Sequence, residues 1–125
     1  MKGDLGVFGA CADETRLRLL FLLTQRELCV CELVEVLDMP QGKVSRHLAV
    51  LKRVGLVRDR REGTWIYYAL EAPATELKKK LDAYLRAQGE KLAVPVRDLA
   101  RLRELAAKGQ ICAPRQTRKA GTGRQ

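Results

Sequence analysis

The sequence predicts a single, mostly α-helical domain that contains one β-hairpin. Apolar residues recur at helical spacing over most of the chain, whereas residues 56–70 are rich in aromatic and β-branched residues typical of strands. The length of 125 residues suits one domain, and a hydrophobic content of 46% is enough to form a core. We expect residues 1–112 to form this domain. Residues 113–125 contain four basic residues and no acidic one, which predicts a disordered basic tail.

The first half of the domain is predicted to be helical. Residues 5–11 form a short apolar lead, and Asp13 is well placed to cap a following helix that is buried on most sides. Apolar spacing predicts a short helix over residues 28–37 and another over residues 41–54. The second of these ends at Gly55, a residue suited to the left-handed conformation at a helix end. The pattern is therefore helix, short turn, helix.

The second half begins with the hairpin and ends with long helices. Residues 56–61 and 64–70 flank a Glu-Gly turn, and the hairpin must pack on the helices because an isolated one is barely stable. An amphipathic helix follows from Leu77; Pro95 interrupts it, and the pattern then continues to Gly109. Its leucine stripe either packs on the core of the same chain or forms a dimer, and we expect a homodimer through these terminal helices.

The charge of the chain points to a polyanionic partner. The net charge is +9, of which +4 lies in the tail, so the body is basic as well. Such a charge favours nucleic acid or an acidic membrane surface. The longest apolar run, Leu19–Leu23, is far too short to span a membrane, and the N-terminus lacks a signal-type segment. We therefore expect a cytoplasmic protein without a membrane partner, whose cysteines stay reduced.

The helix over residues 41–54 has the two faces expected of a DNA-recognition helix. Leu48 and Leu51 lie within about 40° of Val44 on a helical wheel, and all three residues face the core. The opposite face is small or basic, which suits a major groove, although a solvated surface helix is the alternative. His47 lies at the boundary, where it contacts either a phosphate or a neighbouring carbonyl. The residues predicted to bind DNA are Gln41, Lys43, Ser45, Arg46, His47, Arg53 and, beside the hairpin tip, Arg60 and Arg61.

Two closely spaced cysteines, Cys29 and Cys31, are the candidate ligands of a soft metal or metalloid ion. In a regular helix their side chains would point roughly 200° apart, so they share one ion only if the segment is non-helical or distorts. The helix N-terminus favours the thiolate form of both. Burial as small hydrophobic residues is the alternative. Cys11 lies in an apolar stretch, and Cys112, near the tail, is either a further ligand or an exposed bystander.

Several motifs together resemble the ArsR/SmtB family of metal-responsive repressors. The similar stretches are residues 12–18, 27–33, 43–48, 55–57 and 61–65. The resemblance implies a winged helix-turn-helix homodimer that binds double-stranded operator DNA when metal-free and releases it when an inducer binds. No catalytic activity and no catalytic cofactor are implied.

The segment Glu-Leu-Cys-Val-Cys-Glu-Leu is similar to the arsenic-responsive branch, which implies arsenite as inducer, with antimonite as an alternative. Arsenic sensors of this kind have a third cysteine three residues after the second, where this chain has Val34. Cys11, from the same or the other protomer, is our first choice of third ligand, and Cys112 is the alternative. Two thiolates alone would suit an organic trivalent arsenical. The family's histidine-based zinc site is excluded because His47 is the only histidine.

Two rival functions remain open at this stage. The chain is alternatively a cadmium- or lead-responsive repressor of the same family, or a DNA-binding regulator that senses oxidation through its thiols. An enzyme is not expected, because the chain has Cys-x-Cys rather than Cys-x-x-Cys, no strand-helix-strand pattern and no phosphate-binding glycine loop.

Overall fold

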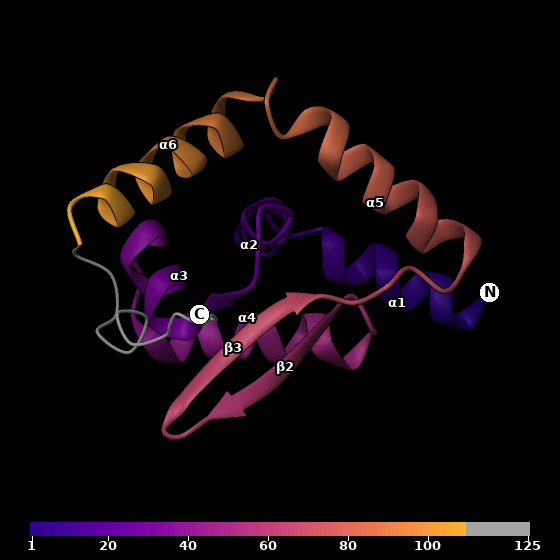
Figure 1. Ribbon diagram of the computed structural model, residues 1–125. Coiled ribbons are helices and arrows are strands. Elements are labelled where there is room, and N and C mark those ends of the chain that lie inside the picture. The colour runs from indigo at the N-terminus through magenta and orange to yellow at the C-terminus, as the bar shows by residue number, and fades with distance from the viewer. Residues whose placement is uncertain (110–125) are drawn as a thin grey trace.

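The computed structural model describes residues 1–109; Cys112 and the predicted tail at residues 113–125 lie outside this range. Within it, the chain forms six helices and three strands, which confirms the prediction of a mostly helical domain with one hairpin (Figure 1). The elements are α1 (Lys2–Cys11), α2 (Glu14–Leu23), β1 (Leu28–Cys29), α3 (Val30–Leu37), α4 (Gln41–Arg53), β2 (Val57–Glu62), β3 (Trp65–Leu70), α5 (Glu76–Gln88) and α6 (Ala93–Ala107).

The N-terminal segment is a helix rather than a short apolar lead. In α1, Val7 and Ala10 are buried one turn apart, while Leu5 and Phe8 remain exposed, so burial follows the helical period. The predicted cap of the next helix is confirmed, because the Asp13 carboxylate accepts a hydrogen bond from the Arg16 backbone N–H at 3.0 Å. The α2 helix then passes through the centre of the core.

The helix-turn-helix is confirmed, but its first helix starts two residues later than predicted. Leu28 and Cys29 form strand β1, which pairs with Tyr68 and Tyr67 of β3. The partner strand lies about 40 residues further along the chain, so local periodicity carried no sign of this pairing. Helix α3 then packs on α4 after a turn in which Asp38 has a left-handed backbone with φ of 55°.

The hairpin completes a three-stranded antiparallel sheet of order β1-β3-β2. Its register runs from Val57 opposite Leu70 to Glu62 opposite Trp65. Only Val57 of β2 is buried, so the tip of the hairpin projects from the helices as a wing (Figure 1). The arrangement is the predicted winged helix-turn-helix.

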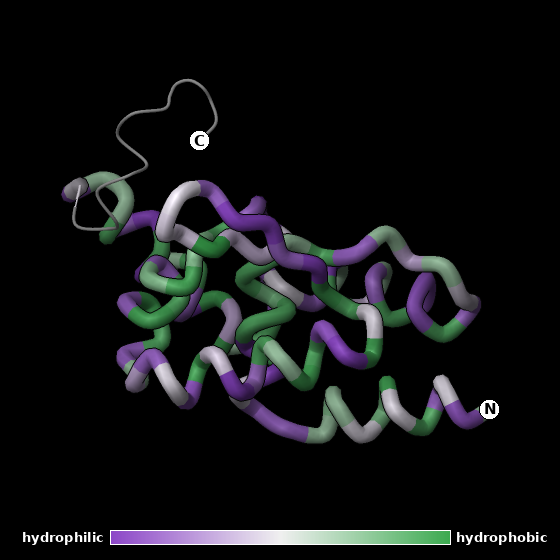
Figure 2. Tube along the Cα trace, turned by 90° about the horizontal axis from the view of Figure 1, so that it is seen from below, coloured by the Kyte–Doolittle hydropathy of each residue, from purple (hydrophilic) through white to green (hydrophobic). Residues whose placement is uncertain are grey.

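The two terminal helices are separated at residues 89–92 and not at Pro95. Pro95 is the third residue of α6 and is buried. A proline is tolerated there because the first backbone N–H groups of a helix have no intrahelical acceptor. The leucines of α6, at positions 99, 102 and 105, pack against α2 and α3 of the same chain. Along the helices, hydrophobic and hydrophilic residues alternate as expected for elements with one buried face (Figure 2).

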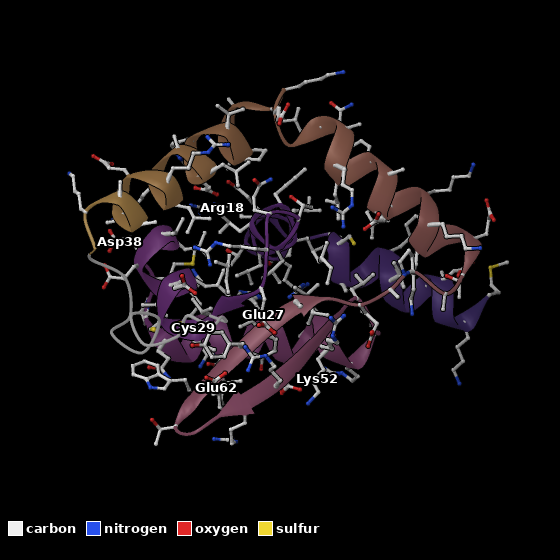
Figure 3. The ribbon with its side chains drawn as sticks, viewed as in Figure 1. Arg18, Glu27, Cys29, Asp38, Lys52 and Glu62 are labelled. Atoms are coloured by element: carbon white, nitrogen blue, oxygen red, sulfur yellow. The ribbon has the colours of Figure 1, made fainter. Side chains whose placement is uncertain are left out.

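Two arginines fasten α6 to the core. The guanidinium of Arg18 in α2, which is labelled in Figure 3, donates to both carboxylate oxygens of Asp98, at 2.8 and 3.0 Å. Asp98 is 2% exposed. Arg101 donates hydrogen bonds to the backbone carbonyls of Glu35 and Val36. The distance from Arg101 Nε to the Val36 carbonyl oxygen is 3.1 Å. A cation at this point satisfies carbonyls that the end of α3 leaves unpaired. No helix in the described part of the chain is long and apolar enough to cross a membrane.

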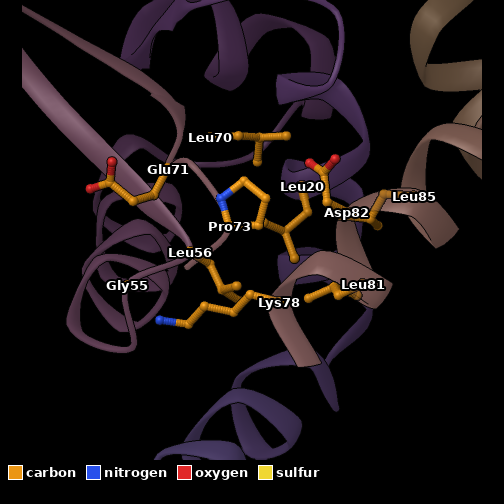
Figure 4. A pocket seen from close by; sticks show the side chains of 10 residues that line it. All are labelled: Leu20, Gly55, Leu56, Leu70, Glu71, Pro73, Lys78, Leu81, Asp82 and Leu85. Atoms are coloured by element: carbon orange, nitrogen blue, oxygen red, sulfur yellow. The ribbon is translucent and has the colours of Figure 1, made fainter. Parts of the chain in front are cut away.

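Replacing Gly55 with alanine should lower the free energy of unfolding by about 1–2 kcal/mol, because a side chain disfavours the left-handed conformation. Gly55 has φ of +78°, and an added Cβ would lie 2.7 Å from Lys78 Nζ (Figure 4). Urea denaturation measures the change. Gly3→Ala is the matched control, since Gly3 lies in α1 with open space around it and should gain stability. An unchanged unfolding midpoint for Gly55→Ala would contradict the prediction.

Candidate nucleic-acid interface and thiol pair

Helix α4 buries its apolar face and presents its basic face to solvent, as predicted. Val44, Leu48 and Leu51 have no exposed surface. The side chains of Gln41, Lys43, Arg46 and Arg53 are exposed, and Ser45 is half-buried. The helix contains no acidic residue, and it lies beside the wing (Figure 1). Such a helix can enter a major groove without placing a carboxylate near phosphate.

His47 is partly buried against two residues at the start of α2, the capping residue Asp13 and Arg16 in the first turn. The Arg16 guanidinium lies 3.1 Å from His47 Nδ1, and because arginine can only donate, Nδ1 is the acceptor. A carboxylate oxygen of Asp13 lies 4.0 Å from the same nitrogen, and the side chain is 18% exposed. His47 therefore lies at the boundary of the core, as in the alternative to a phosphate contact, but its hydrogen-bond partner is Arg16 rather than a backbone carbonyl. Any DNA contact would fall to Nε2.

The two arginines of the wing differ in their surroundings. Arg60 donates to both oxygens of Glu27 and to Glu62, at distances between 2.6 and 3.0 Å, and its guanidinium lies 4.5 Å from the centre of the Tyr67 ring. These carboxylates raise the pKa of Arg60. Arg61 points to the opposite face of β2 because neighbouring residues of a strand alternate. Its side chain is exposed, and within residues 1–109 its guanidinium forms no hydrogen bond or ion pair.

The sulfur atoms of Cys29 and Cys31 lie 2.8 Å apart. Cys29 precedes α3 with an extended backbone, and Cys31 is the second residue of the helix. The two side chains therefore do not point to opposite sides as they would in a regular helix. Cys29 lies in a non-helical segment, which is what the binding of one ion by both residues would require. Cys29, which is labelled in Figure 3, is fully buried, whereas Cys31 is half-buried. A soft ion reaching Cys31 would find a second sulfur beside it.

The environment of Cys29 opposes the thiolate form, so the expectation that the helix N-terminus stabilises it is wrong for this residue. Burial, followed by the negative charge of Glu32, raises the pKa of Cys29 to about 12. The Glu32 carboxylate is itself buried; it accepts a hydrogen bond from the Cys29 backbone N–H at 2.8 Å and pairs with Arg26 at 3.2 Å. A glutamate three residues after a helix cap is a capping-box signal that the sequence contained and that we did not use.

Among the described residues, Cys11 is the third cysteine, and it is not grouped with this pair. Cys11, at the end of α1, is half-buried against the core, and burial raises its pKa. Within residues 1–109, no three Cys, His, Asp or Glu side chains are grouped as a metal site. Val34, the position of the absent third cysteine, packs against the core. Cys112 lies outside the described residues.

A groove that the sequence analysis did not foresee opens beside Cys31. It has a volume of about 290 Å³ and lies between the helix-turn-helix and the wing. Its lining residues are Val30, Cys31, Gln41, Ser45, Thr64, Trp65, Ile66 and Tyr68. They come from three separate parts of the chain, so only the folded arrangement brings Cys31, helix α4 and the aromatic residues of β3 together.

Comparison with known proteins identifies relatives of this chain. The family model described as "Bacterial regulatory protein, arsR family" matches residues 13–59. The arsenical resistance operon repressor of Escherichia coli (strain K12) is 44% identical over 97 residues, which cover 76% of this chain and 83% of that protein.

Solved structures share the fold. Reduced HlyU from Vibrio cholerae N16961 is 30% identical, with a TM-score of 0.63, and the match covers 74% of this chain and 90% of HlyU. The homodimeric winged helix-turn-helix DNA-binding domain Mb0332 from Mycobacterium bovis, described as a possible ArsR-family regulator, is 35% identical with a TM-score of 0.59. That match covers 73% of this chain and 82% of Mb0332.

Proposed function

Because the chain belongs to the arsR family of bacterial regulatory proteins, we propose that it is a repressor that releases operator DNA when trivalent arsenic binds its cysteines. The observation that carries this proposal is the pair of sulfur atoms, 2.8 Å apart, at the start of the first helix of the helix-turn-helix. Trivalent arsenic and antimony are soft and suit thiol ligands. The E. coli relative, named as an arsenical resistance operon repressor, supports arsenic over other soft ions.

The DNA-binding surface in this proposal combines the exposed face of α4 with the wing. The outward residues of α4 would enter the major groove, and Arg61 would contact phosphate beside it. Arg60 would have to leave Glu27 and Glu62 to join them. The net charge of +9 would add sequence-independent attraction to the duplex.

A homodimer is the assembly that we propose for this chain, and its exposed apolar side chains support it. Large apolar side chains are exposed on α1 and α5, among them Leu5 at 63%, Phe8 at 61% and Tyr84 at 51%. Exposed apolar groups that lie together commonly mark an association surface. The Mb0332 neighbour is described as homodimeric. A dimer would also allow Cys11 of one protomer to complete the site of the other, with Cys112 as the alternative third ligand.

Ligand binding would act on DNA affinity through the positions of the two sulfur atoms. These atoms now lie 2.8 Å apart, and an arsenic atom bonded to both would displace one or both of them. Cys29 belongs to β1, which pairs with the wing, and Cys31 belongs to α3, which packs on α4. Either displacement would move one DNA-contacting element relative to the other.

Fluorescence anisotropy of a labelled operator fragment from the protein's own promoter tests the proposal. The fragment is titrated with the full chain under a phosphine reductant, without and with arsenite, cadmium or zinc. We expect arsenite to release the DNA, Cys11→Ser to prevent this release and Cys112→Ser to preserve it. Loss of release in Cys112→Ser alone would reverse the ranking of the third ligand.

The rival functions give different outcomes in the same titration. Release by cadmium but not by arsenite would identify a divalent-metal sensor. Release by an oxidant, reversed by the reductant and independent of any metalloid, would identify a redox regulator. Failure of the chain to bind DNA under any condition would refute the repressor proposal.

Arg61→Met should weaken operator binding and lower the slope of log K against log salt concentration by about 0.9, the value of one phosphate contact. Arg60→Met is the matched control, because the Arg60 guanidinium is already occupied by Glu27 and Glu62. We expect its salt slope to equal that of the unmodified protein. An equal loss of slope in both variants would show that Arg60 leaves its carboxylates to contact DNA.

A further inference from the structure

The guanidinium group of Arg16 joins three elements of the fold. Arg16 lies in the first turn of α2, and its side chain is half-buried. Its Nε donates to the backbone carbonyl of Ala10 at 2.6 Å, and one terminal nitrogen lies 3.5 Å from the carbonyl oxygen of Gly9. The other terminal nitrogen donates to His47 Nδ1 at 3.1 Å. One side chain thus connects the last turn of α1, the start of α2 and helix α4.

Arg16 directs its donors to these neutral acceptors and not to a carboxylate. Within residues 1–109, no carboxylate oxygen lies within 4.0 Å of its guanidinium nitrogens. The nearby carboxylate of Asp13 accepts from the Arg16 backbone N–H instead. Because the donors of a guanidinium have fixed relative directions, the bonds to α1 determine where the donor to His47 lies. The position of the imidazole is therefore tied to the end of α1.

The bond to Nδ1 also determines which nitrogen of His47 carries hydrogen. A guanidinium only donates, so Nδ1 is the acceptor and the neutral imidazole keeps its hydrogen on Nε2. A hydrogen on Nδ1 would gain no partner in exchange, because the Asp13 oxygen is 4.0 Å away. Nε2 has no hydrogen-bond acceptor within residues 1–109. His47 is partly exposed one turn after the exposed Lys43, so this donor lies beside a cation of α4.

We propose that Arg16 is a positioning residue of the DNA interface, which holds His47 so that Nε2–H donates to a phosphate oxygen of the operator. The inference rests on the proposed function and adds a residue outside α4 and the wing on which DNA binding depends. A phosphate contact of this kind fixes the register of the protein on the duplex without reading its sequence. One hydrogen bond to a charged acceptor corresponds to about tenfold in affinity.

Arg16 also satisfies carbonyls at the end of α1, so a role in DNA binding must be separated from a role in folding. Arg16→Lys keeps the charge, and with it the long-range attraction to the duplex, but loses the rigid set of donors. His47→Asn keeps an oxygen near the position of Nδ1 and loses the donor to phosphate. If Arg16 acts through His47, the two substitutions remove the same contact, and their effects on affinity do not multiply.

Operator anisotropy of the full chain without arsenite measures these effects. We expect His47→Asn to weaken binding about tenfold, and Arg16→Lys to weaken it by a similar factor. The double variant should bind within about twofold of His47→Asn alone. Arg18→Lys is the matched control, because Arg18 lies two residues further along α2 and pairs with Asp98. It should leave operator binding unchanged with either residue at position 47.

The single histidine allows the hydrogen position to be measured directly. Only His47 contributes imidazole signals to a proton–nitrogen correlation spectrum, so no further assignment is needed. Above about pH 8, where ordinary imidazoles are neutral, we expect hydrogen on Nε2 and none on Nδ1 in the unmodified chain. In Arg16→Lys the two nitrogen signals should approach each other as both tautomers become populated. Capping of α1 alone would not produce this change.

The outcomes separate this inference from the proposed function. Unchanged binding in His47→Asn, losses that multiply in the double variant, or hydrogen on Nδ1 in the unmodified chain would each overturn the role of Arg16 and leave the repressor proposal standing. If the unmodified chain does not bind the operator, both proposals fail. Equal helix content by circular dichroism in all variants is the check that a lost contact, and not a lost fold, is measured.

Discussion

Replacing Cys29 with serine should abolish the release of operator DNA by arsenite while leaving DNA binding intact. Allosteric coupling of this kind amounts to about 5- to 150-fold in affinity. Without the Cys29 sulfur, arsenite could no longer join β1 to α3, so we expect the affinities with and without arsenite to agree within about twofold. Serine should preserve the local fold because it is a good helix cap and Cys29 is the residue that caps α3. Operator anisotropy with and without arsenite measures the ratio.

Two controls make this result specific. Cys31→Ser should give the same loss, since each sulfur is expected to bind the same ion. Circular dichroism should show unchanged helix content in both variants, which separates loss of sensing from loss of fold. Full inducibility of Cys29→Ser protein that still binds the operator would remove the sulfur pair from the mechanism.

Replacing Asp98 with alanine should lower the free energy of unfolding by about 3–5 kcal/mol. Arg18 is 14% exposed and Asp98 is 2% exposed, so the variant leaves a guanidinium charge largely buried without its carboxylate. Two hydrogen bonds between the residues are lost together with the charge pairing. Because the pair joins α2 to α6, we expect α6 to lose its protection from hydrogen exchange first. Urea denaturation gives the change in stability.

An exposed ion pair of α6 provides the matched control. Glu104 and Lys108 are 57% and 56% exposed, and Glu104→Ala should change stability by less than about 1 kcal/mol. The double variant Arg18→Met/Asp98→Leu should be more stable than Asp98→Ala, because it removes both charges and leaves apolar groups. A loss of stability in Asp98→Ala as small as that in Glu104→Ala would mean that water reaches the Arg18 charge.

Features controlled by residues close in sequence were predictable from the sequence alone. The cap at Asp13, the left-handed Gly55 and the two faces of α4 match the structure. The hairpin is also present, but its turn is Gly63-Thr64 rather than the predicted Glu62-Gly63, because Glu62 pairs with Trp65. Each depends on the backbone preference of one residue or on a hydrophobic period within one element. The candidate DNA-binding face of α4 followed from the same kind of information, since burial of one side of a helix determines which side is exposed.

The errors occurred where backbone partners lie far apart in the chain. Leu28 and Cys29 fit a helical period, yet they pair with β3, whose backbone groups no local pattern could reveal. Pro95 was taken as the end of a helix because proline cannot continue one from within. Its actual position in the first turn of α6 depends on where the preceding helix stops.

The sequence by itself determined the fold class, the basic recognition helix and the presence of two adjacent soft ligands. The tertiary structure decided what those ligands experience: it brings the two sulfurs together, buries Cys29 beside Glu32 and opens an aromatic groove beside Cys31. It also binds Arg60 to Glu27, 33 residues away, and leaves Arg61 exposed. The physical reason is that burial, pairing of charges and cavity shape arise from contacts between distant segments, whereas helical period and capping are local.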